Sequence, residues 1–439
     1  MKNYDEVIDF MFSSLPMYQR IGAAAYKNDL STSLKLDEYF EKPHQYYKTI
    51  HIAGTNGKGS VSNSLASVLQ DAGYKVGLYT SPHLTDYRER IRINGEMISK
   101  EFVCDFINNN QQIINELKPS FFEMTSEMAF VYFKEMKVDI AVIEVGMGGR
   151  LDSTNVINPI LSIITNISYD HTQFLGNTLA KIAKEKAGII KHNVPVIIGE
   201  NNAKTKKVFI EIAKNQSAEI KFAKDYFKTK LFKKSKFNIL SKTDKKNIIV
   251  DFQLKGHYQL ENLNTIFTAI ELLRLKDFKI SDQQLINGLE NITQNTHFQG
   301  RWQIIKKYPL TICDIGHNKA GLEQIIKQLE EERLGNTKTI RKLHIVLGFV
   351  NDKNVSEILK IFPKDVNVIY YFTQASVPRA LDVDILFEEA KKAGLKGKSY
   401  KNVETAYKNA VKNANNEDIV FVGGSTFVVA DFLEIESIY

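Results

Sequence analysis

Short apolar runs alternate with segments of helical period along the first 275 residues. Residues 58–72 place Val61, Leu65, Val68 and Leu69 on one face of a helix, and Gly73 follows at its end. Further helices are predicted at 100–117, 126–137, 177–190 and 261–275, and strands at 47–54, 76–80, 139–146, 160–166 and 194–199. Continuous apolar strands of this kind are typical of a mostly parallel sheet that is buried on both faces.

The pattern restarts after Arg301. Strands are predicted at 310–315, 342–349, 366–373 and 418–422, and helices at 320–334, 355–361, 384–393 and 404–413. A unit of about 140 residues is large enough for a small domain. The polar residues 291–300 (NITQNTHFQG) are the predicted linker. We therefore expect an α/β protein with one domain over 1–295 and a smaller, Rossmann-like α/β domain over 301–439.

The composition narrows the class of protein. Of 439 residues, 43% are hydrophobic and 25% charged, as in ordinary globular proteins, which excludes dominant disorder. The two cysteines are too few for a disulfide scaffold or a Cys-based zinc site. Asp5, Glu6 and Asp9 argue against a targeting peptide, and no apolar run approaches the ~18–20 residues of a membrane span. A cytoplasmic protein without a membrane partner is expected.

The net charge of +7 arises from one lysine-rich segment of the chain. Residues 204–246 contain 14 Lys against four acidic residues and no Arg. Such a stretch can bind nucleic acid, but the absence of Arg favours a solvated peripheral face, which would also tolerate a polyanionic small substrate. No nucleic-acid partner is expected.

A glycine-rich loop, Gly54-Thr55-Asn56-Gly57-Lys58-Gly59-Ser60, joins a predicted strand to a predicted helix. Backbone N–H groups at such a helix start face an anion, and a lysine neutralises its charge. The Walker A pattern needs Gly where Ile52 lies and Ser or Thr at position 59, whereas the hydroxyl here comes one residue late. The alternative is an ordinary glycine-rich turn.

Three further polar residues are candidates for a binding site. Glu144 ends a predicted strand, where a carboxylate faces the ligand crevice of a parallel sheet and suits a hard cation. His171 closes the segment TNISYDH after another strand, and Lys186 lies in a helix. By themselves, a strand-end Glu can cap a loop, a lone His is more often structural, and a helical Lys is usually solvated.

Seven motifs occur in one order: GTNGKGS (54–60), TSPHL (80–84), FFEMT (121–125), EVGMGGRLDSTN (144–155), TNISYDH (165–171), EKAGIIK (185–191) and DIGHN (314–318). Together they resemble the folylpolyglutamate synthase/dihydrofolate synthase family of the Mur ligase superfamily, over nearly the whole chain. The resemblance implies a P-loop ATPase domain of the Mur central type, followed by a glutamate-binding C-terminal domain. The displaced hydroxyl is the superfamily's own form of the phosphate loop.

The resemblance also implies site residues. ATP is expected at Thr55, Asn56, Gly57, Lys58, Gly59, Ser60, Asn262, Arg301 and Asp314, and one or two Mg²⁺ ions at Ser60, Ser81, Glu144 and His171. The pterin region matches Phe121, Phe122, Glu123, Leu151 and Asp152, and a substrate loop is matched loosely near residues 20–22. Lys58, Lys186 and His317 are the implied catalytic residues, Lys186 as an N-carboxylated side chain. For His317, a turn-stabilising role is an equal alternative.

The implied reaction is ATP-dependent addition of L-glutamate to dihydropteroate, to reduced folyl-polyglutamates, or to both, through an acyl phosphate, by a monomer. Three departures from the family pattern leave the functional groups in place: Gln299-Gly300-Arg301, DIGHN and ENLNT (261–265). The main alternative is a Mur-type ligase for a cell-wall UDP-sugar precursor, against which SPHL, Arg88–Ile91 and FFEMT argue. A P-loop NTPase without ligation and a non-catalytic scaffold are further alternatives.

Overall fold

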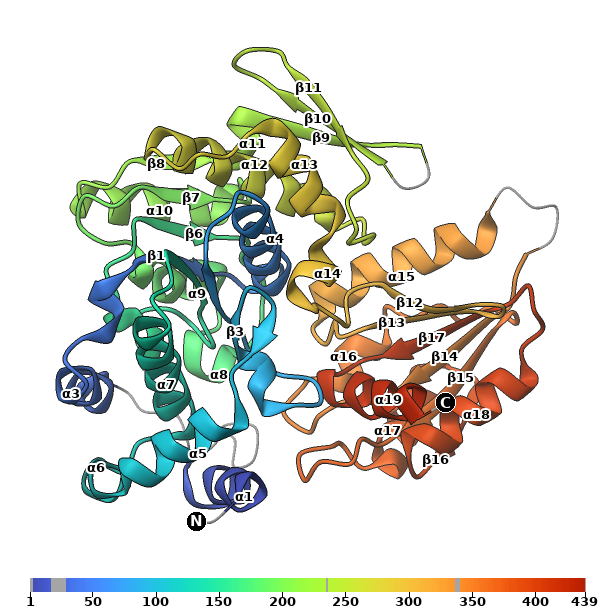
Figure 1. The fold of residues 1–439 in the computed structure, drawn as a ribbon. Coiled ribbons are helices and arrows are strands. Elements are labelled where there is room, and N and C mark those ends of the chain that lie inside the picture. Colours follow the sequence, from blue (N-terminus) through green and yellow to red (C-terminus); the bar gives the residue numbers. More distant parts are fainter. Residues whose placement is uncertain (1–2, 17–28, 234–235, 336–339, 439) are drawn as a thin grey trace. The chain divides into compact units, whose positions relative to one another are not determined.

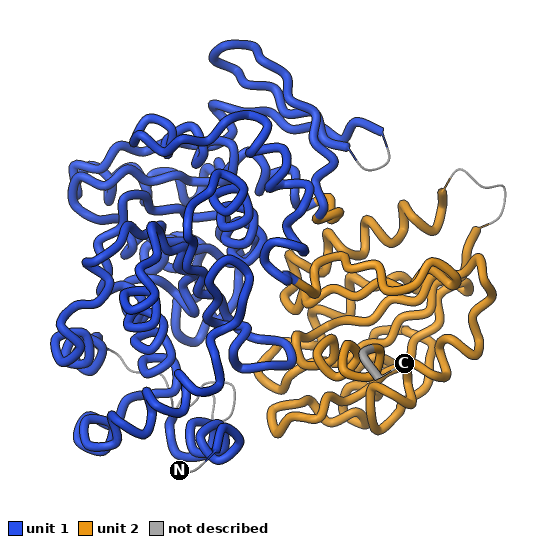
Figure 2. Tube along the Cα trace, in the orientation of Figure 1, with its two compact units in different colours: residues 1–253, 258–298 blue, residues 254–257, 299–439 orange. Residues whose placement is uncertain are grey.

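A computed structural model describes residues 3–16, 29–233, 236–335 and 340–438. The chain divides into two compact units (Figure 2): Met1–Gln253 with Tyr258–Phe298, and Leu254–His257 with Gln299–Tyr439. The predicted linker over 291–300 contains helix α14 (Ile292–Thr296) of the first unit. The loosely matched loop near residues 20–22 lies outside the described residues.

The first unit is built on an eight-stranded sheet in the order β4-β3-β2-β5-β1-β6-β7-β8 (Figure 1). All neighbouring strands from β2 to β8 pair in parallel, and the short strands β3 and β4 add an antiparallel edge. The strands are β1 (Lys48–Ala53), β2 (Val76–Tyr79), β3 (Ile91–Ile93), β4 (Glu96–Met97), β5 (Ile140–Glu144), β6 (Leu161–Ile164), β7 (Val196–Ile198) and β8 (Ile220–Phe222). The predicted buried parallel sheet is confirmed.

Helices cover both faces of this sheet. The longer ones are α1 (Tyr4–Ser14), α3 (Ser31–Tyr39), α4 (Lys58–Asp71), α5 (Lys100–Asn109), α6 (Gln111–Leu117), α7 (Phe121–Glu135), α9 (Leu179–Lys186), α10 (Ala203–Asn215), α12 (Gln259–Leu275) and α13 (Asp282–Glu290). Short turns of helix are α8 (Thr172–Leu175), α11 (Ala223–Tyr226), η2 (Pro43–Tyr46), η3 (Tyr87–Arg90), η4 (Ser153–Val156) and η5 (Ala187–Ile189). Helix α4 is buried along most of its length because it packs against the sheet, α12 and α13.

Two helices of the first unit differ from the predicted ones. Helix α7 begins at Phe121 instead of residue 126, because the Ser120 hydroxyl accepts from the Glu123 N–H and the Glu123 carboxylate accepts from the Ser120 N–H. The predicted helix over 100–117 is divided at Asn110 into α5 and α6.

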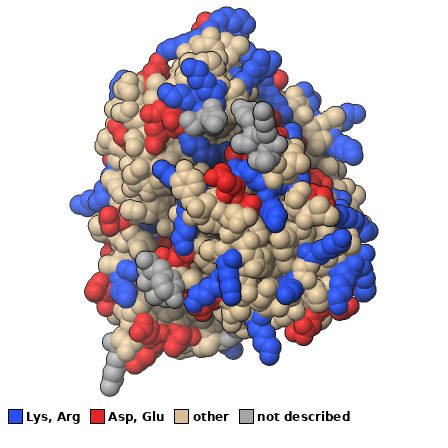
Figure 3. All heavy atoms as spheres, turned by 90° about the vertical axis from the view of Figure 1, so that its right-hand side faces the viewer, with Lys and Arg blue, Asp and Glu red and all other residues tan. Residues whose placement is uncertain are grey.

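The lysine-rich stretch forms much of a three-stranded antiparallel sheet, β9 (Phe227–Phe232), β10 (Lys236–Ser241) and β11 (Asn247–Val250). Phe237 and Ile239 are buried on its inner side, whereas Lys228, Lys230 and Lys236 are exposed. On one face of the molecule, Lys and Arg side chains are spread widely, with Asp and Glu among them (Figure 3). The expected solvated face is in keeping with this exposure.

The second unit is a smaller α/β unit with a six-stranded sheet in the order β12-β13-β17-β14-β15-β16. Only the edge strand β12 is antiparallel to its neighbour within this described sheet. Its elements are β12 (Gln303–Lys307), β13 (Leu310–Asp314), α15 (Lys319–Leu334), β14 (Leu343–Leu347), α16 (Val355–Leu359), β15 (Val368–Thr373), α17 (Val383–Lys392), β16 (Gly397–Tyr400), α18 (Val403–Asn413), β17 (Ile419–Gly423) and α19 (Thr426–Ile438). The predicted α/β class is therefore confirmed in both units.

Across the described ranges, we find no helix with both the length and the apolarity needed to cross a lipid bilayer.

Candidate active site

The phosphate-loop candidate begins at the carboxyl edge of the first unit's parallel sheet. Ile52 pairs with Glu144, and Ala53 with Ile164, so β1, β5 and β6 end side by side. Strand β2 ends at the same level, because Tyr79 pairs with Ile143. The segments that follow these four strands, which carry most of the predicted site residues, therefore start along one edge.

The glycine loop is held in place by the segment after β6. The Thr165 hydroxyl donates to the Asn56 carbonyl oxygen at 2.6 Å, and the Asn56 N–H donates to Asn166 Oδ1 at 2.9 Å. The Thr55 hydroxyl also donates to the carbonyl oxygen of Ser168 at 3.2 Å. These contacts hold the loop against the segment that follows β6. The sequence motif TNISYDH contained these residues, but only its histidine was given a role.

Gly57 precedes helix α4 with φ of +87°, a backbone conformation that favours glycine. A Cβ atom there would lie 2.5 Å from Asn262 Oδ1, so Asn262 of α12 lies directly against the loop. Gln259 of the same helix donates through Nε2 to the Ser60 hydroxyl at 3.2 Å and accepts from Asn262 Nδ2 at 2.7 Å. Sequence reasoning found Asn262 but missed Gln259, although both lie in one turn of helix.

Two lysines converge on one carbonyl group. Lys58 Nζ donates to the Gly54 carbonyl oxygen at 3.1 Å, and Lys186 Nζ donates to the same oxygen at 2.9 Å. Lys186 is 4% exposed. Burial, and then the charge of Lys58, lower the pKa of Lys186 from 10.5 to about 7. Two ammonium groups that share one acceptor repel each other, whereas the charges of Asp170 and Asp152 act in the opposite direction and raise the pKa of Lys186.

The predicted metal ligands are mostly oxygen donors. Glu144 is buried at the end of β5, Ser60 is buried in the first turn of α4, and Ser81 follows β2. His171 begins α8 with φ of +47°. No cluster of three or more His, Cys, Asp or Glu side chains able to hold a metal lies among the described residues. One carboxylate with hydroxyl groups fits Mg²⁺, which keeps few protein ligands and takes the others from phosphates and water.

Arg92 was missed by the sequence reasoning. This arginine is 5% exposed and donates through Nη2 to the Thr80 hydroxyl at 3.1 Å. Burial lowers its pKa to about 10, and the charges of Glu89 and Glu144 act in the opposite direction. Its guanidinium is thus a fixed positive charge within the electrostatic range of Glu144. An Arg between two isoleucines in a short strand was the available signal.

Among the predicted pterin residues, the two phenylalanines pack against neighbouring residues, and the two carboxylates accept hydrogen bonds from protein groups. The Phe122 ring lies against Gly146, where a Cβ atom would come within 2.3 Å of it, and Phe121 is buried beside Tyr87. Glu123 accepts from the Ser120 N–H at 2.7 Å and from the Ser33 hydroxyl at 3.3 Å. Asp152 similarly accepts from protein donors. Leu151 lies just before it, partly exposed.

The second unit holds the other three predicted site residues. Asp314 ends β13 and is buried; its carboxylate accepts from the N–H groups of Trp302 and Gly316, both at 2.8 Å. Arg301 donates through Nη1 to the Gly300 carbonyl oxygen at 3.2 Å. His317 Nδ1 lies 3.1 Å from the Ile315 carbonyl oxygen, which can only accept, so Nδ1 carries the proton.

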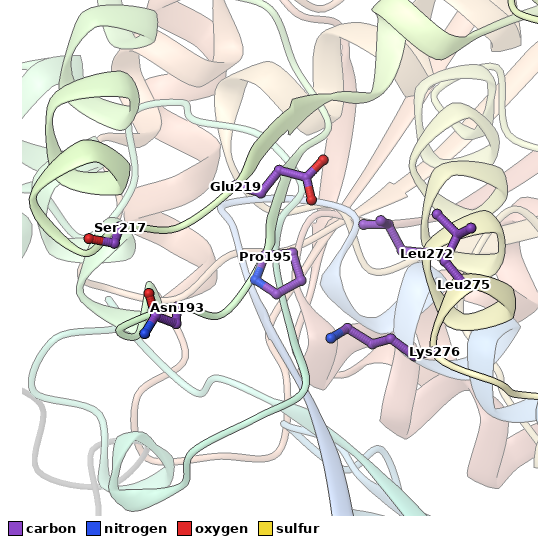
Figure 4. A pocket seen from close by; sticks show the side chains of 7 residues that line it. All are labelled: Asn193, Pro195, Ser217, Glu219, Leu272, Leu275 and Lys276. Carbon is purple, nitrogen blue, oxygen red and sulfur yellow. The ribbon is translucent and has the colours of Figure 1, made fainter.

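A cavity of about 340 Å³ lies at the amino ends of β7 and β8 in the first unit, whereas the predicted site residues follow the carboxyl ends of the strands (Figure 4). Pro195 and Glu219 precede β7 and β8, and Leu272 and Leu275 lie near the end of α12. Leu275 is 78% exposed, so the cavity is an open hollow. None of the predicted site residues lines it.

Comparisons with known proteins find Mur ligase domains along most of the chain. Residues 52–270 match the Mur ligase middle domain, and residues 300–426 match the Mur ligase glutamate ligase domain. The dihydrofolate synthase/folylpolyglutamate synthase of Buchnera aphidicola is 32% identical over 88% of this chain and 88% of its own. A probable bifunctional folylpolyglutamate synthase/dihydropteroate synthase of Haloferax volcanii is 29% identical over 98% of this chain, which spans only 50% of that protein's length.

Solved structures of similar proteins cover both units. The folylpolyglutamate synthase of Thermotoga maritima is 32% identical, with a TM-score of 0.79 over 99% of this chain and 96% of its own. Escherichia coli FolC in complex with DHPP and ADP is 25% identical, with a TM-score of 0.84 over 100% and 98%. A bifunctional folylpolyglutamate synthase/dihydrofolate synthase with Mn, AMPPNP and L-glutamate bound is 26% identical, with a TM-score of 0.82 over 99% and 98%.

The order of the motifs, the shared carboxyl edge of β1, β2, β5 and β6, and relatives of 32% identity over most of both chains lead to one conclusion. The chain belongs to the folylpolyglutamate synthase/dihydrofolate synthase family of the Mur ligase superfamily.

Proposed function

We propose that the protein is an ATP-dependent amide ligase that adds L-glutamate to dihydropteroate, to reduced folyl-polyglutamates, or to both. The observation that carries the proposal is the glycine loop with Lys58 and Lys186 at the same sheet edge as Glu144. The relatives' names, and the ADP, AMPPNP, Mn and L-glutamate in their structures, support the same reaction.

A carboxylate has a poor leaving group, which the reaction must replace before an amide can form. The substrate carboxylate attacks the γ-phosphorus of ATP, the bond to ADP breaks, and an acyl phosphate forms. The glutamate amine then attacks the acyl carbon, loses a proton, and expels phosphate as the amide forms. Such chemistry depends mostly on positioning and on charge neutralisation. The N–H groups of residues 57–60, at the start of α4, and the Lys58 ammonium supply these for the phosphates.

A divalent metal fits the donor set of Ser60, Ser81, Glu144 and His171, and it would neutralise charge on the phosphates. We assign Asn262 and Gln259 to holding the loop and the Ser60 hydroxyl from α12. Phe122 and Leu151 are assigned to the acid substrate.

For the second unit we assign Arg301 and Asp314 to the nucleotide. Since Asp314 already accepts from two backbone N–H groups, its main contribution is to shape the turn before His317. We assign His317, whose Nδ1 donates to the Ile315 carbonyl oxygen, to orienting the attacking amine or taking its proton.

Lys186 is proposed to react with CO₂ through its neutral amine and to carry the resulting carbamate. A lysine with a pKa near 7 supplies that amine at physiological pH. The carbamate would convert the repulsion between Lys58 and Lys186 into attraction. Carbon-13 NMR in labelled bicarbonate should show a carbamate signal that is absent from Lys186→Met, and no such signal in the native protein would refute the modification.

The deciding experiment measures ADP release and glutamate incorporation with dihydropteroate, dihydrofolate and tetrahydrofolate in turn. A UDP-sugar peptide is included as the acceptor of the alternative cell-wall ligase. Turnover with a folate-type acid and none with the UDP-sugar peptide is expected. ADP release that needs no acceptor would support a non-ligating NTPase instead. Sedimentation of the same preparation tests the expected monomer.

A further inference from the structure

Four consecutive side chains after the loop 146–151 are buried, each against a different part of the first unit. Ser153 is 2.9 Å from the Ser126 hydroxyl of α7, and Asn155 donates through Nδ2 to the Gly188 carbonyl oxygen at 3.1 Å. Thr154 is completely buried, and its hydroxyl lies 2.9 Å from His51 Nε2 in β1. The segment 152–155 is therefore a fixed junction.

Asp152 connects this junction to the preceding loop 146–151. Its Oδ1 accepts from the Thr154 hydroxyl at 2.5 Å and from the Thr154 N–H at 3.1 Å, and its Oδ2 accepts from the Met147 N–H at 2.9 Å. Burial raises the pKa of Asp152, and these hydrogen bonds oppose that rise. The Asp152 carboxylate thus joins the loop 146–151 to the junction through the Met147 N–H and the two Thr154 donors.

The direction of the hydrogen bonds follows from counting protons. Both oxygens of Asp152 accept from N–H groups, and Oδ1 also accepts from the Thr154 hydroxyl, so the single hydroxyl proton of Thr154 points to Asp152. His51 Nε2 must then donate to the Thr154 oxygen, and the ring carries its proton on Nε2. The opposite tautomer would bury an unpaired N–H, because His51 Nδ1 has no hydrogen-bond partner and the ring is completely buried. Burial and the charge of Lys191 lower the pKa of His51 to about 3, so the ring is neutral.

The loop that Asp152 holds also contacts the segment of Lys186. The Arg150 N–H donates to the Glu185 carbonyl oxygen at 2.8 Å. At Gly149, a Cβ atom would come within 2.8 Å of the Lys186 carbonyl oxygen, so the two backbones touch. A displacement of the loop would therefore move Lys186 relative to Gly54 and Lys58.

We infer that His51 and Thr154 are positioning residues that form a one-way hydrogen-bond chain, His51 to Thr154 to Asp152, which fixes the loop 146–151 against Lys186. Neither residue was given a role by sequence reasoning. The effect on turnover rests on the proposed function, whereas the direction of the chain does not.

The first test compares Thr154→Val, which keeps the shape and removes the hydroxyl, with Thr154→Ser, which restores it. Thr154→Val should lower kcat/KM for the folate-type acid at least tenfold, since small misplacements near reacting groups are costly. The KM for L-glutamate should change less than twofold, because the matched glutamate ligase domain begins at residue 300. Thr154→Ser should return to within threefold of the native value.

The control is Thr268→Val, in α12 of the same unit. Thr268 is equally buried, but its hydroxyl donates to the Asn264 carbonyl oxygen, outside the chain. Native kinetics are expected for Thr268→Val. Native kinetics for Thr154→Val, or equal losses in both variants, would overturn the positioning role.

The second test does not depend on activity. Nitrogen-15 NMR of the imidazole rings, with the His51 signals assigned by their loss in His51→Gln, should show a neutral Nε2–H ring from pH 6 to 8. In Thr154→Val, the Nε2–H signal should shift as its acceptor is lost. An Nδ1–H tautomer, or protonation in this range, would overturn the chain. If the native protein ligates nothing, the proposed function fails while this measurement still decides the inference.

Discussion

Lys58 and Lys186 donate to the same Gly54 oxygen, and burial together with the charge of Lys58 brings the pKa of Lys186 to about 7. The folded protein releases the Lys186 proton above about pH 7, whereas the unfolded chain keeps it up to about 10.5. Between these values the unfolded state binds more protons. The free energy of unfolding should therefore rise with pH, by at most about 1.4 kcal/mol per unit.

Urea unfolding of the native protein and of Lys186→Met, in bicarbonate-free buffer from pH 6.5 to 9.5, measures this contribution as their difference. Lys191→Met is the control, since burial lowers the pKa of Lys191 only to about 8, and its contribution should begin one unit higher. A pH-independent difference between the native protein and Lys186→Met would contradict the prediction.

Gly57 and Gly73 allow steric strain to be separated from backbone strain. Both have positive φ, +87° and +91°, but a Cβ atom at Gly57 meets Asn262 at 2.5 Å, whereas nothing lies within 4 Å at Gly73. Gly73→Ala should cost only the left-handed backbone, about 1 kcal/mol. Gly57→Ala should also move Asn262 or the loop and lower ADP affinity at least tenfold. Calorimetry with Mg·ADP checks this, and equal ADP affinity in both variants would refute it.

The site residues differ in how much the sequence revealed. Lys58 and Glu144 were predicted because each lies in a recognisable motif at the end of a predicted strand, whereas Lys186, inside a helix, was predicted only from the family resemblance. Arg92 and Gln259 could not be predicted, because their roles depend on which partners the fold brings to them: Thr80 for one and Ser60 for the other. Local patterns do not contain such pairings.

At the scale of elements, the capping box of α7 gives Glu123 a structural role that competes with its predicted one. Glu123→Ala would remove acceptors from the buried Ser120 N–H and the Ser33 hydroxyl. We expect a loss of about 1–2 kcal/mol in the free energy of unfolding.

The matched control is Gln284→Ala in the capping box of α13, which is exposed and should cost less. Urea unfolding measures both variants, and the KM for the folate-type acid measures the other role. A raised KM without loss of stability would return Glu123 to the substrate site.

Elements with strong patterns were predicted, and those without them were not. The apolar strands β1, β5, β6 and β17 stand out because both faces are buried. The sheet β9–β11 was missed because its strands alternate polar and apolar residues instead of forming continuous apolar runs, and Leu231, Phe232 and Ile249 are exposed. The break between α5 and α6 is a local bend at Asn110 within a continuous helical period.

At the scale of the whole molecule, the second unit includes four residues, Leu254–His257, that interrupt the first unit in sequence. The buried Gln328 of α15 accepts from the His257 N–H at 2.7 Å and donates to the Lys255 carbonyl oxygen at 3.3 Å. Gln328→Ala should lower the melting temperature of the second unit by about 3 °C, in line with a loss of roughly 1 kcal/mol.

Gln324→Ala is the matched control, because Gln324 is an exposed residue on the same helix. Scanning calorimetry should show no change for it. An equal fall in the melting temperatures of both units after Gln328→Ala, or no fall in either, would show that the contact with residues 254–257 does not stabilise the second unit specifically.

The chain thus passes between the units three times, at 253/254, 257/258 and 298/299. Chimaeras that exchange everything after residue 298 with a relative would carry a foreign α15 against the resident tetrapeptide. Such exchanges should succeed only when residue 328 and residues 254–257 come from the same protein. The unit suited to recombination is therefore encoded by two separate segments of the gene.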